Sequence, residues 1–117
     1  MTTKEKLEKI VAAADELKAE QIETLDVGGK TSITDFFVVC TGTSDRHASS
    51  IADKIRERLL EEKEKPLRVE GENTGWVLLD FGDVVVHVMR DEQRQFYDIE
   101  SLWKEMSLNP DVIRRDA

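Results

Sequence analysis

The side chains in this chain that are best suited to binding or catalysis lie in one stretch, GWVLLDFGDVVVHVM, which runs from Gly75 to Met89. Asp80 and Asp83 flank a Phe-Gly pair that is typical of a tight turn, and His87 follows in the same stretch. Two carboxylates on a rigid turn could together bind a divalent cation. Because flanking carboxylates at a solvated turn more often serve solubility, the sequence does not predict a metal site here.

Two short segments match parts of enzyme motifs, but the rest of each motif is missing from the sequence. The segment Gly29–Thr31 has the end of a phosphate-binding loop, but Thr24 stands where that loop requires a glycine. The triplet Asp80–Gly82 matches the metal-holding triplet of protein kinases, yet no glycine-rich loop or catalytic loop accompanies it. Both segments are therefore predicted to be turns, where glycine tolerates a positive φ.

His47 is the other candidate for catalysis. The hydroxyls of Ser44, Ser49 and Ser50 are close to it in the sequence, but no nucleophile elbow or relay surrounds it. It lies in the first turn of a predicted helix, where unpaired backbone donors could also hold an anion. The sequence favours a capping and surface role for His47, and it predicts no catalytic residue, no cofactor and no enzymatic activity.

The same Gly75–Met89 stretch predicts a β-hairpin with two chemically different faces. If Phe81 and Gly82 form a two-residue loop, the flanking strands pair residue by residue. The predicted pairs on one face are Asp80 with Asp83, Leu78 with Val85, and Trp76 with His87. The opposite face is wholly aliphatic and should pack against helices; its members are Val77, Leu79, Val84, Val86 and Val88.

A rigid surface of mixed aromatic, aliphatic and acidic groups is typical of a docking site for another macromolecule. Alternatively, Trp76 and His87 are an ordinary cross-strand pair that is half exposed. Before the last predicted helix, Phe96 is expected to pin that helix to the sheet and Tyr97 to lie at the edge of the interface. The residues predicted to form the contact surface are Trp76, Leu78, Asp80, Asp83, Val85, His87 and Tyr97.

The elements that must position this hairpin begin with an amphipathic helix. Thr2 and Glu5 have the spacing of a capping box. The apolar residues that follow at helical period are Leu7, Ile10, Val11, Ala14 and Leu17. A short strand over residues 22–27 is then followed by a Gly-Gly turn, and residues 36–42 form an apolar run typical of a buried central strand.

A second helix begins at Thr43-Ser44-Asp45, which can cap its N-terminus, and ends before Pro66. Its apolar positions are Ala48, Ile51, Ala52, Ile55 and Leu59. A strand over residues 67–70 precedes the hairpin. In the last helix, Asp98 is the predicted cap, Ile99, Leu102, Trp103 and Met106 are the apolar face, and Asn109-Pro110 is the end. The order predicts an α/β or α+β fold, a mixed five-stranded sheet with helices mainly on one face.

Length and composition limit the class of protein. With 117 residues, the whole chain 1–117 is expected to be a single domain. The formal net charge of −8 opposes non-specific binding to phosphates, so a nucleoprotein partner would be contacted through its protein. The one cysteine, Cys40, is expected to be a small buried hydrophobic residue. No stretch resembles a signal peptide or membrane span, so a cytoplasmic protein is expected.

Several ordered blocks resemble the ribosomal silencing factor family, RsfS, also called the iojap-like family. They are TSITDFFVVCTGTSDRH (Thr31 to His47), VEG (Val69 to Gly71), GWVLLDFGDVVVHVM (Gly75 to Met89) and QFYDIESLW (Gln95 to Trp103). The resemblance covers most of the chain, from about Ile22 to Trp103. It implies a cytosolic bacterial protein that binds the large ribosomal subunit through ribosomal protein L-fourteen.

Such a protein would block joining of the small subunit and lower translation when nutrients are scarce, with a role in large-subunit assembly left open. The resemblance also implies a core similar to that of nucleotidyltransferases but without their catalytic signature. This chain lacks that signature too, since Gly42–Ser44 is followed by no Asp-x-Asp strand. The family's contact surface surrounds the tryptophan of the GWVLLD block, which is Trp76 here.

Two other functions stay open at this point. A small metal-dependent enzyme, similar to a nucleotidyltransferase, would use Asp80, Asp83 and His47 around a cation. A homodimeric adaptor would use its open sheet face for a second copy of itself. If the chain is such an enzyme, adding nucleotide or Mg²⁺ should raise its melting temperature. The homodimer predicts a change in scattered light on dilution and is compatible with ribosome binding.

Overall fold

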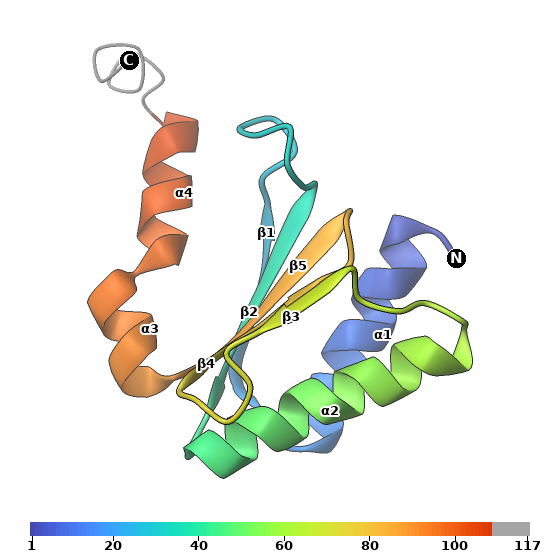
Figure 1. Cartoon of the computed structure of the whole chain (residues 1–117). Coiled ribbons are helices and arrows are strands. Elements are labelled where there is room, and N and C mark those ends of the chain that lie inside the picture. Colours follow the sequence, from blue (N-terminus) through green and yellow to red (C-terminus); the bar gives the residue numbers. More distant parts are fainter. Residues whose placement is uncertain (109–117) are drawn as a thin grey trace.

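The computed structural model describes residues 1–108, with side chains as far as Trp103. The helices and strands, in chain order, are α1 (Thr3–Glu16), β1 (Glu20–Asp26), β2 (Phe36–Gly42), α2 (Asp45–Glu61), β3 (Arg68–Glu70), β4 (Trp76–Asp80), β5 (Val84–Arg90), α3 (Asp91–Tyr97) and α4 (Ile99–Leu108) (Figure 1). The predicted order of elements is confirmed, except that two helices, α3 and α4, stand where one was expected. Asn109-Pro110 and the side chain of Met106 lie outside the described residues.

The strands form one five-stranded sheet in the order β1-β2-β5-β4-β3. Strands β2 and β5 are parallel, and the other neighbours are antiparallel, so the sheet is mixed as predicted. Helices α1 and α2 cover one face, and α3 and α4 lie at the other side of the sheet (Figure 1). The α+β class with a mixed five-stranded sheet is therefore confirmed. The helices are less one-sided than predicted, because the two long helices share one face while α3 and α4 lie at the other side.

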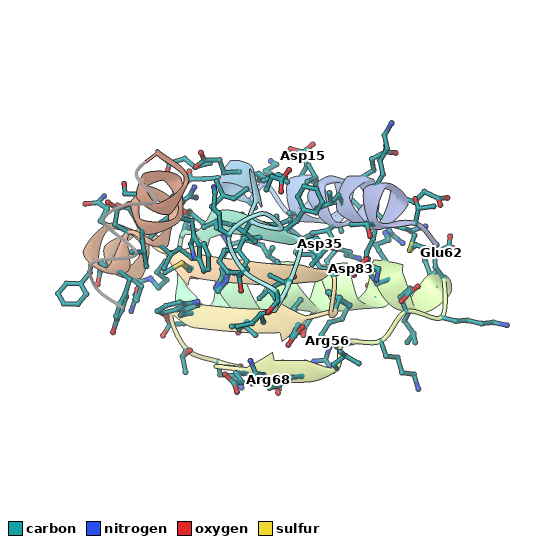
Figure 2. All side chains as sticks on the ribbon, turned by 90° about the horizontal axis from the view of Figure 1, so that it is seen from above. Asp15, Asp35, Arg56, Glu62, Arg68 and Asp83 are labelled. Atoms are coloured by element: carbon teal, nitrogen blue, oxygen red, sulfur yellow. The ribbon has the colours of Figure 1, made fainter. Side chains whose placement is uncertain are left out.

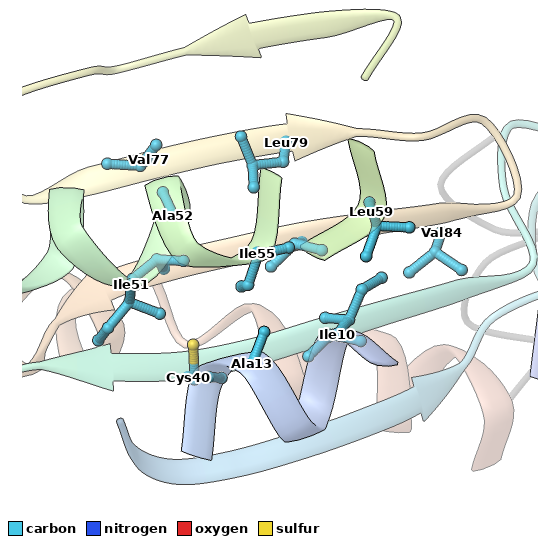
Figure 3. Packing of buried hydrophobic residues seen from close by; sticks show 14 of the residues in the cluster. Ile10, Ala13, Cys40, Ile51, Ala52, Ile55, Leu59, Val77, Leu79 and Val84 are labelled. Atoms are coloured by element: carbon cyan, nitrogen blue, oxygen red, sulfur yellow. The ribbon is translucent and has the colours of Figure 1, made fainter. Parts of the chain in front are cut away.

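The main core lies between α1, α2 and the aliphatic face of the sheet (Figure 3). All the apolar positions predicted for α2 are buried, and so is the whole predicted aliphatic face of the hairpin. In α1 the buried apolar residues are Ile10, Ala13 and Ala14, with Leu7 and Leu17 packed at the margin. Helical periodicity therefore identified the buried face of α2 fully. In α1 it missed the buried Ala13 and included Val11, which is only half-buried and lies outside the core cluster.

Both long helices begin where the sequence predicts. The Thr2 hydroxyl accepts a hydrogen bond from the Glu5 backbone N–H at 3.1 Å, and the Glu5 carboxylate accepts from Thr2 N–H at 2.9 Å. The Ser44 hydroxyl accepts from the His47 backbone N–H at 3.0 Å. These side chains satisfy backbone donors that have no partner inside the helix.

The hairpin register differs from the prediction by one loop position. The two-residue loop is Gly82-Asp83, because the Phe81 N–H donates to the Val84 carbonyl at 2.9 Å. Gly82 takes a positive φ of 91° at the first loop position, as type II′ turns require. Trp76 consequently lies opposite Met89, and Leu78 lies opposite His87. The physical reason is that the Phe81 side chain is buried in the core, so Phe81 pairs with Val84 instead of entering the loop.

The loop shift leaves the two faces of the strands as predicted. Moving the loop by one residue displaces each partner by two positions, and side chains two apart point to the same face. Trp76, Leu78 and Asp80 therefore still share a face with Val85 and His87. Only Asp83 changes its place, because it is now a loop residue rather than a strand residue.

The C-terminal helices differ most from expectation. Asp98 adopts a left-handed conformation with φ 42° and ends α3 before α4 begins. Phe96 does not pin a helix to the sheet, because its side chain is 81% exposed. Ile99 and Trp103 pack against the sheet, whereas Leu102 is exposed. The sequence showed the apolar residues of this region but not which of them face the sheet. Within residues 1–108, no helix is long and apolar enough to cross a membrane.

Candidate functional site

The sheet face opposite α1 and α2 is only partly covered. A second buried cluster lies there, formed by Leu25, Val27, Val39 and Met89, with Phe37, Trp76, Ile99 and Trp103 half-buried around it. Beyond that cover, the half-exposed side chains of Leu78 and Asp80 continue the face toward the hairpin turn. Strands β2, β5 and β4 thus support a mixed surface, as the two-faced hairpin predicted.

Trp76 lies at the boundary between this cluster and solvent. It is half-buried, its ring lies 4.8 Å from that of Tyr97, and its Nε1–H donates to His87 Nδ1 at 3.1 Å. Trp76 and His87 are diagonal neighbours rather than the directly opposed pair of the prediction. The indole is only partly buried, and its contacts with His87 and Tyr97 hold it in one orientation.

His87 supports the indole from beneath. It is only 6% exposed, and its ring meets the edge of Phe37 at 4.9 Å. Burial lowers the pKa of His87 to about 4, so the ring is neutral near pH 7. Because Nδ1 accepts from Trp76, the proton is on Nε2, which has no hydrogen-bond partner among the described residues. His87 therefore positions Trp76 and presents little surface to a partner.

Further aromatic rings extend the surface in both directions. The rings in contact follow one another in the order Phe96, Tyr97, Trp76, His87, Phe37 and Trp103, with centroids 4.8–5.9 Å apart. Phe37 and Phe96 were not predicted as part of the surface, although strand alternation placed Phe37 on the face opposite Phe36. No local signal in the sequence reveals that Phe96 is exposed.

Asp83 does not belong to this surface. Its carboxylate accepts hydrogen bonds from Lys6 Nζ at 2.7 Å and Thr3 Oγ1 at 2.6 Å, both in α1. Partial burial by itself would raise the pKa of Asp83, but the bonds from Lys6 and Thr3 outweigh it and lower that pKa. The sequence pattern missed this contact because it joins residues 77 and 80 positions apart.

Asp80 remains on the predicted face. One of its oxygens accepts from the Gly82 N–H at 2.8 Å, and the other lies 4.0 Å from the Arg68 guanidinium. Figure 2 labels Asp83 at the hairpin turn and Arg68 on the edge strand β3. Since Asp80 and Asp83 bind different groups, they do not form a shared cation site. Among the described residues, no three His, Cys, Asp or Glu side chains gather as metal ligands.

Arg94 fixes the C-terminal helices to the sheet. Its guanidinium is buried and donates to the Gln21 carbonyl at 2.6 Å, to Thr41 Oγ1 at 2.9 Å and to Glu100 at 2.8 Å. It also lies 3.4 Å from the Glu23 carboxylate. One side chain thus joins α3, α4, β1 and β2 and sets the position of Tyr97 beside Trp76.

The remaining chemical candidates have structural roles. His47 Nδ1 accepts from the Thr43 N–H at 2.9 Å, which leaves Nε2 to donate to the Leu17 carbonyl at 2.7 Å. Both ring nitrogens therefore bind backbone groups, in keeping with the predicted capping role. Cys40 is buried, as predicted, and burial raises the pKa of its thiol to about 12. A thiol with that pKa is a poor nucleophile at neutral pH.

Comparisons with known proteins agree with the resemblance noted above. A family model described as "Ribosomal silencing factor during starvation" matches residues 1–116. A "Ribosomal silencing factor RsfS" from Halalkalibacterium halodurans is 40% identical over 104 residues, covering 88% of this chain and 89% of the relative. A crystal structure of a Chromobacterium violaceum protein has a TM-score of 0.86 and 37% identity, covering 89% of this chain and 88% of that one.

A more distant relative carries a different name. The mouse protein "Mitochondrial assembly of ribosomal large subunit protein 1" is 30% identical over 101 residues. The matched region covers 83% of this chain but only 44% of the mouse protein. Similarity therefore extends from bacterial silencing factors to a protein named for assembly of the large ribosomal subunit.

Proposed function

This chain belongs to the ribosomal silencing factor family, RsfS, and from that premise we propose that it binds the large ribosomal subunit through ribosomal protein L-fourteen. Bound there, in the cytoplasm, it would block joining of the small subunit and so repress translation. The observation that carries the proposal is the half-exposed Trp76 ring, held by His87 and Tyr97 on an incompletely covered sheet face. A role in large-subunit assembly is compatible with the same contact and is supported by the mouse relative's name.

The contact surface we propose is narrower than the one predicted from the sequence. Trp76, Leu78, Asp80 and Tyr97 offer exposed atoms and would touch the partner directly. Val85 and His87 are nearly covered and would act by supporting that surface. Asp83 is omitted because Lys6 and Thr3 already bind its carboxylate.

The physical mechanism would be steric exclusion. A stable protein interface typically covers about 800 Å² on each partner, which is a sizeable part of the surface of a small domain. A protein seated on the subunit-joining face would occupy space that the small subunit needs, without making or breaking a covalent bond. Most of the affinity would come from the rigid aromatic residues, because such anchors lose little side-chain freedom on binding.

Replacing Trp76 tests the proposal. The Trp76→Ala protein should bind purified large subunits at least about 2 kcal/mol more weakly, which is a typical cost for a central aromatic anchor. Co-sedimentation over a range of protein concentrations measures the change. Leu60→Ala, which removes an exposed apolar side chain from α2 on the other side of the sheet, is the matched control and should bind normally.

Two results would contradict this proposal. If folded Trp76→Ala protein binds large subunits as tightly as the unaltered chain, the contact surface has been assigned to the wrong face. If the unaltered chain lets purified small and large subunits join freely at saturating concentration, steric exclusion is wrong. Circular dichroism of each variant establishes that the fold is retained.

A further inference from the structure

Helix α3 carries a shallow hollow beside Trp76 that no sequence prediction identified. Its volume is about 310 Å³, and its lining residues are Glu92, Gln93, Phe96 and Tyr97. These positions form two pairs spaced by four residues, so they lie on adjoining rows of one helix face. The hollow adjoins the proposed contact surface, because the Tyr97 ring lies 4.8 Å from the Trp76 ring.

Two aromatic rings of the hollow are open to solvent. Phe96 is 81% exposed and Tyr97 is 53% exposed, and their rings meet edge to face at 5.0 Å. The helix that carries them is held in place by the buried Arg94. Because the Phe96 side chain is exposed, its burial contributes little to the stability of the fold. An accessible ring face attracts cations and planar guanidinium groups.

The polar groups of the hollow also suit a cationic ligand. Within the described part of the chain, the exposed Glu92 carboxylate has one contact with a cation, at 3.5 Å from Arg90, which also lies 3.6 Å from Asp45. The other nearby cation, Arg94, is buried and already bound to Glu100. Gln93 Oε1 is a buried acceptor without a partner among the described residues. Because that oxygen is covered, the Glu92 carboxylate is the acceptor that a cation in the hollow would meet.

We infer that the hollow on α3 binds the guanidinium group of an arginine side chain presented by the ribosomal partner. This inference rests on the proposed function and adds a chemical identity to one part of the contact. The guanidinium stacks on the exposed ring of Phe96 and lies beside the edge-to-face Tyr97 ring, and its N–H groups donate to the Glu92 carboxylate. Arginine fits better than lysine because a planar group can stack and donate in the same plane.

A peptide titration tests the ligand chemistry directly. The probes are three blocked tripeptides with arginine, lysine or citrulline between two glycines, added to the full chain at millimolar concentrations. In amide NMR spectra, the arginine peptide should cause saturable shifts at residues 92–97. The lysine peptide should bind about two- to fivefold more weakly, as expected for an exposed stacking site, and the uncharged citrulline peptide more weakly still. Equal binding of arginine and lysine, or no saturable shift at these residues, overturns the inference.

Matched substitutions test the lining residues. Phe96→Leu keeps the apolar volume but removes the ring, and Glu92→Gln removes only the charge; each should weaken binding of the arginine peptide by about two- to fivefold. Asp91→Asn is the control, because it removes the same charge one residue away, where the carboxylate is bound to Gln95 at 2.7 Å. An equal effect of Asp91→Asn would show a general charge effect and overturn the site.

Co-sedimentation with large subunits separates the two proposals. If Trp76→Ala and Phe96→Leu both weaken binding, both are supported. If only Trp76→Ala weakens it, the ribosomal contact stands and the arginine site is overturned. If only Phe96→Leu weakens it, the hollow is part of the contact and the central role of Trp76 is wrong. If neither does, both proposals fail.

Discussion

At the scale of single residues, Trp76 owes its orientation to a buried neighbour rather than to its own packing. Its N–H donates to His87 Nδ1, a bond that requires the neutral form of the imidazole. His87 is kept neutral by burial, which disfavours the charged form. His87, which was predicted to contact the partner, is therefore better described as the residue that supports Trp76. Its protonation should change the free energy of unfolding.

The pH dependence of stability should reveal His87. Its pKa is lowered from 6.5 to about 4 on folding, so between those values the unfolded chain binds a proton that the folded protein does not. Stability should therefore fall as the pH falls, by about 2 kcal/mol from about pH 7 to about pH 5. Urea unfolding at both pH values measures the difference.

The comparison variant for this experiment is His87→Gln. The amide does not titrate but can still accept a hydrogen bond from Trp76, so the loss of stability between the two pH values should largely disappear. A loss of the same size in the variant would assign the effect to other groups. Asp83 does not interfere, because its lowered pKa confines its loss of stabilisation to pH values below the ordinary carboxyl value of 3.8.

At the scale of elements, the contact surface depends on contacts between segments far apart in the chain. Arg94 binds a backbone carbonyl of β1, a hydroxyl of β2 and a carboxylate of α4. Asp83 in the hairpin turn binds Lys6 and Thr3 of α1. The first contact places the aromatic residues of α3 beside Trp76, and the second fixes the hairpin that carries Trp76.

Replacing Arg94 should therefore damage both stability and the surface. Arg94→Met leaves the partly buried Glu100 carboxylate without its cation, and removal of one partner from such a pair costs about 3 kcal/mol or more. Urea unfolding measures the loss, and amide hydrogen exchange of α3 should rise. The control is Arg58→Met, since Arg58 and its partner Glu16 are far more exposed and the loss should be much smaller. A similar loss in both variants would contradict the role of Arg94.

At the scale of the whole molecule, charge determines how the chain approaches its partner. The net charge is −8, so ribosomal RNA should repel the chain whereas a basic ribosomal protein attracts it. The acidic groups around the contact surface include the half-exposed Asp80 and the exposed Glu92, which would meet such a protein first. Attraction of this kind accelerates association more than it slows dissociation.

Salt should therefore act mainly on the association rate. Raising monovalent salt from about 0.1 M to about 0.5 M shortens the screening length, and the association rate constant with large subunits should fall while the dissociation rate constant changes little. Stopped-flow fluorescence of a dye attached to the chain away from this sheet face provides the readout. An association rate that increases with salt would instead indicate that repulsion by RNA dominates the approach. The proposed homodimer stays a prediction that light scattering over a dilution series would test.

The helices and strands, and the two sides of each strand, follow from local patterns in the chain. The buried positions of α2 and the two hairpin faces follow from periods of 3.6 and 2, which are properties of neighbouring residues. The caps at Thr2 and Ser44 are equally local, and blocks such as QFYDIESLW made the family recognisable. Interactions within a few residues of chain were sufficient for all of these.

Which of the predicted surface residues are accessible to a partner depends instead on contacts between distant segments of the chain. The loop lies at Gly82-Asp83 because the core takes Phe81, Asp83 is bound by α1, and Phe96 is exposed because Arg94 fixes α3 in one place. Each of these outcomes depends on a partner distant in the chain. Alternation and periodicity fix which side of an element a residue is on, but burial and pairing depend on which other elements come to lie against that side.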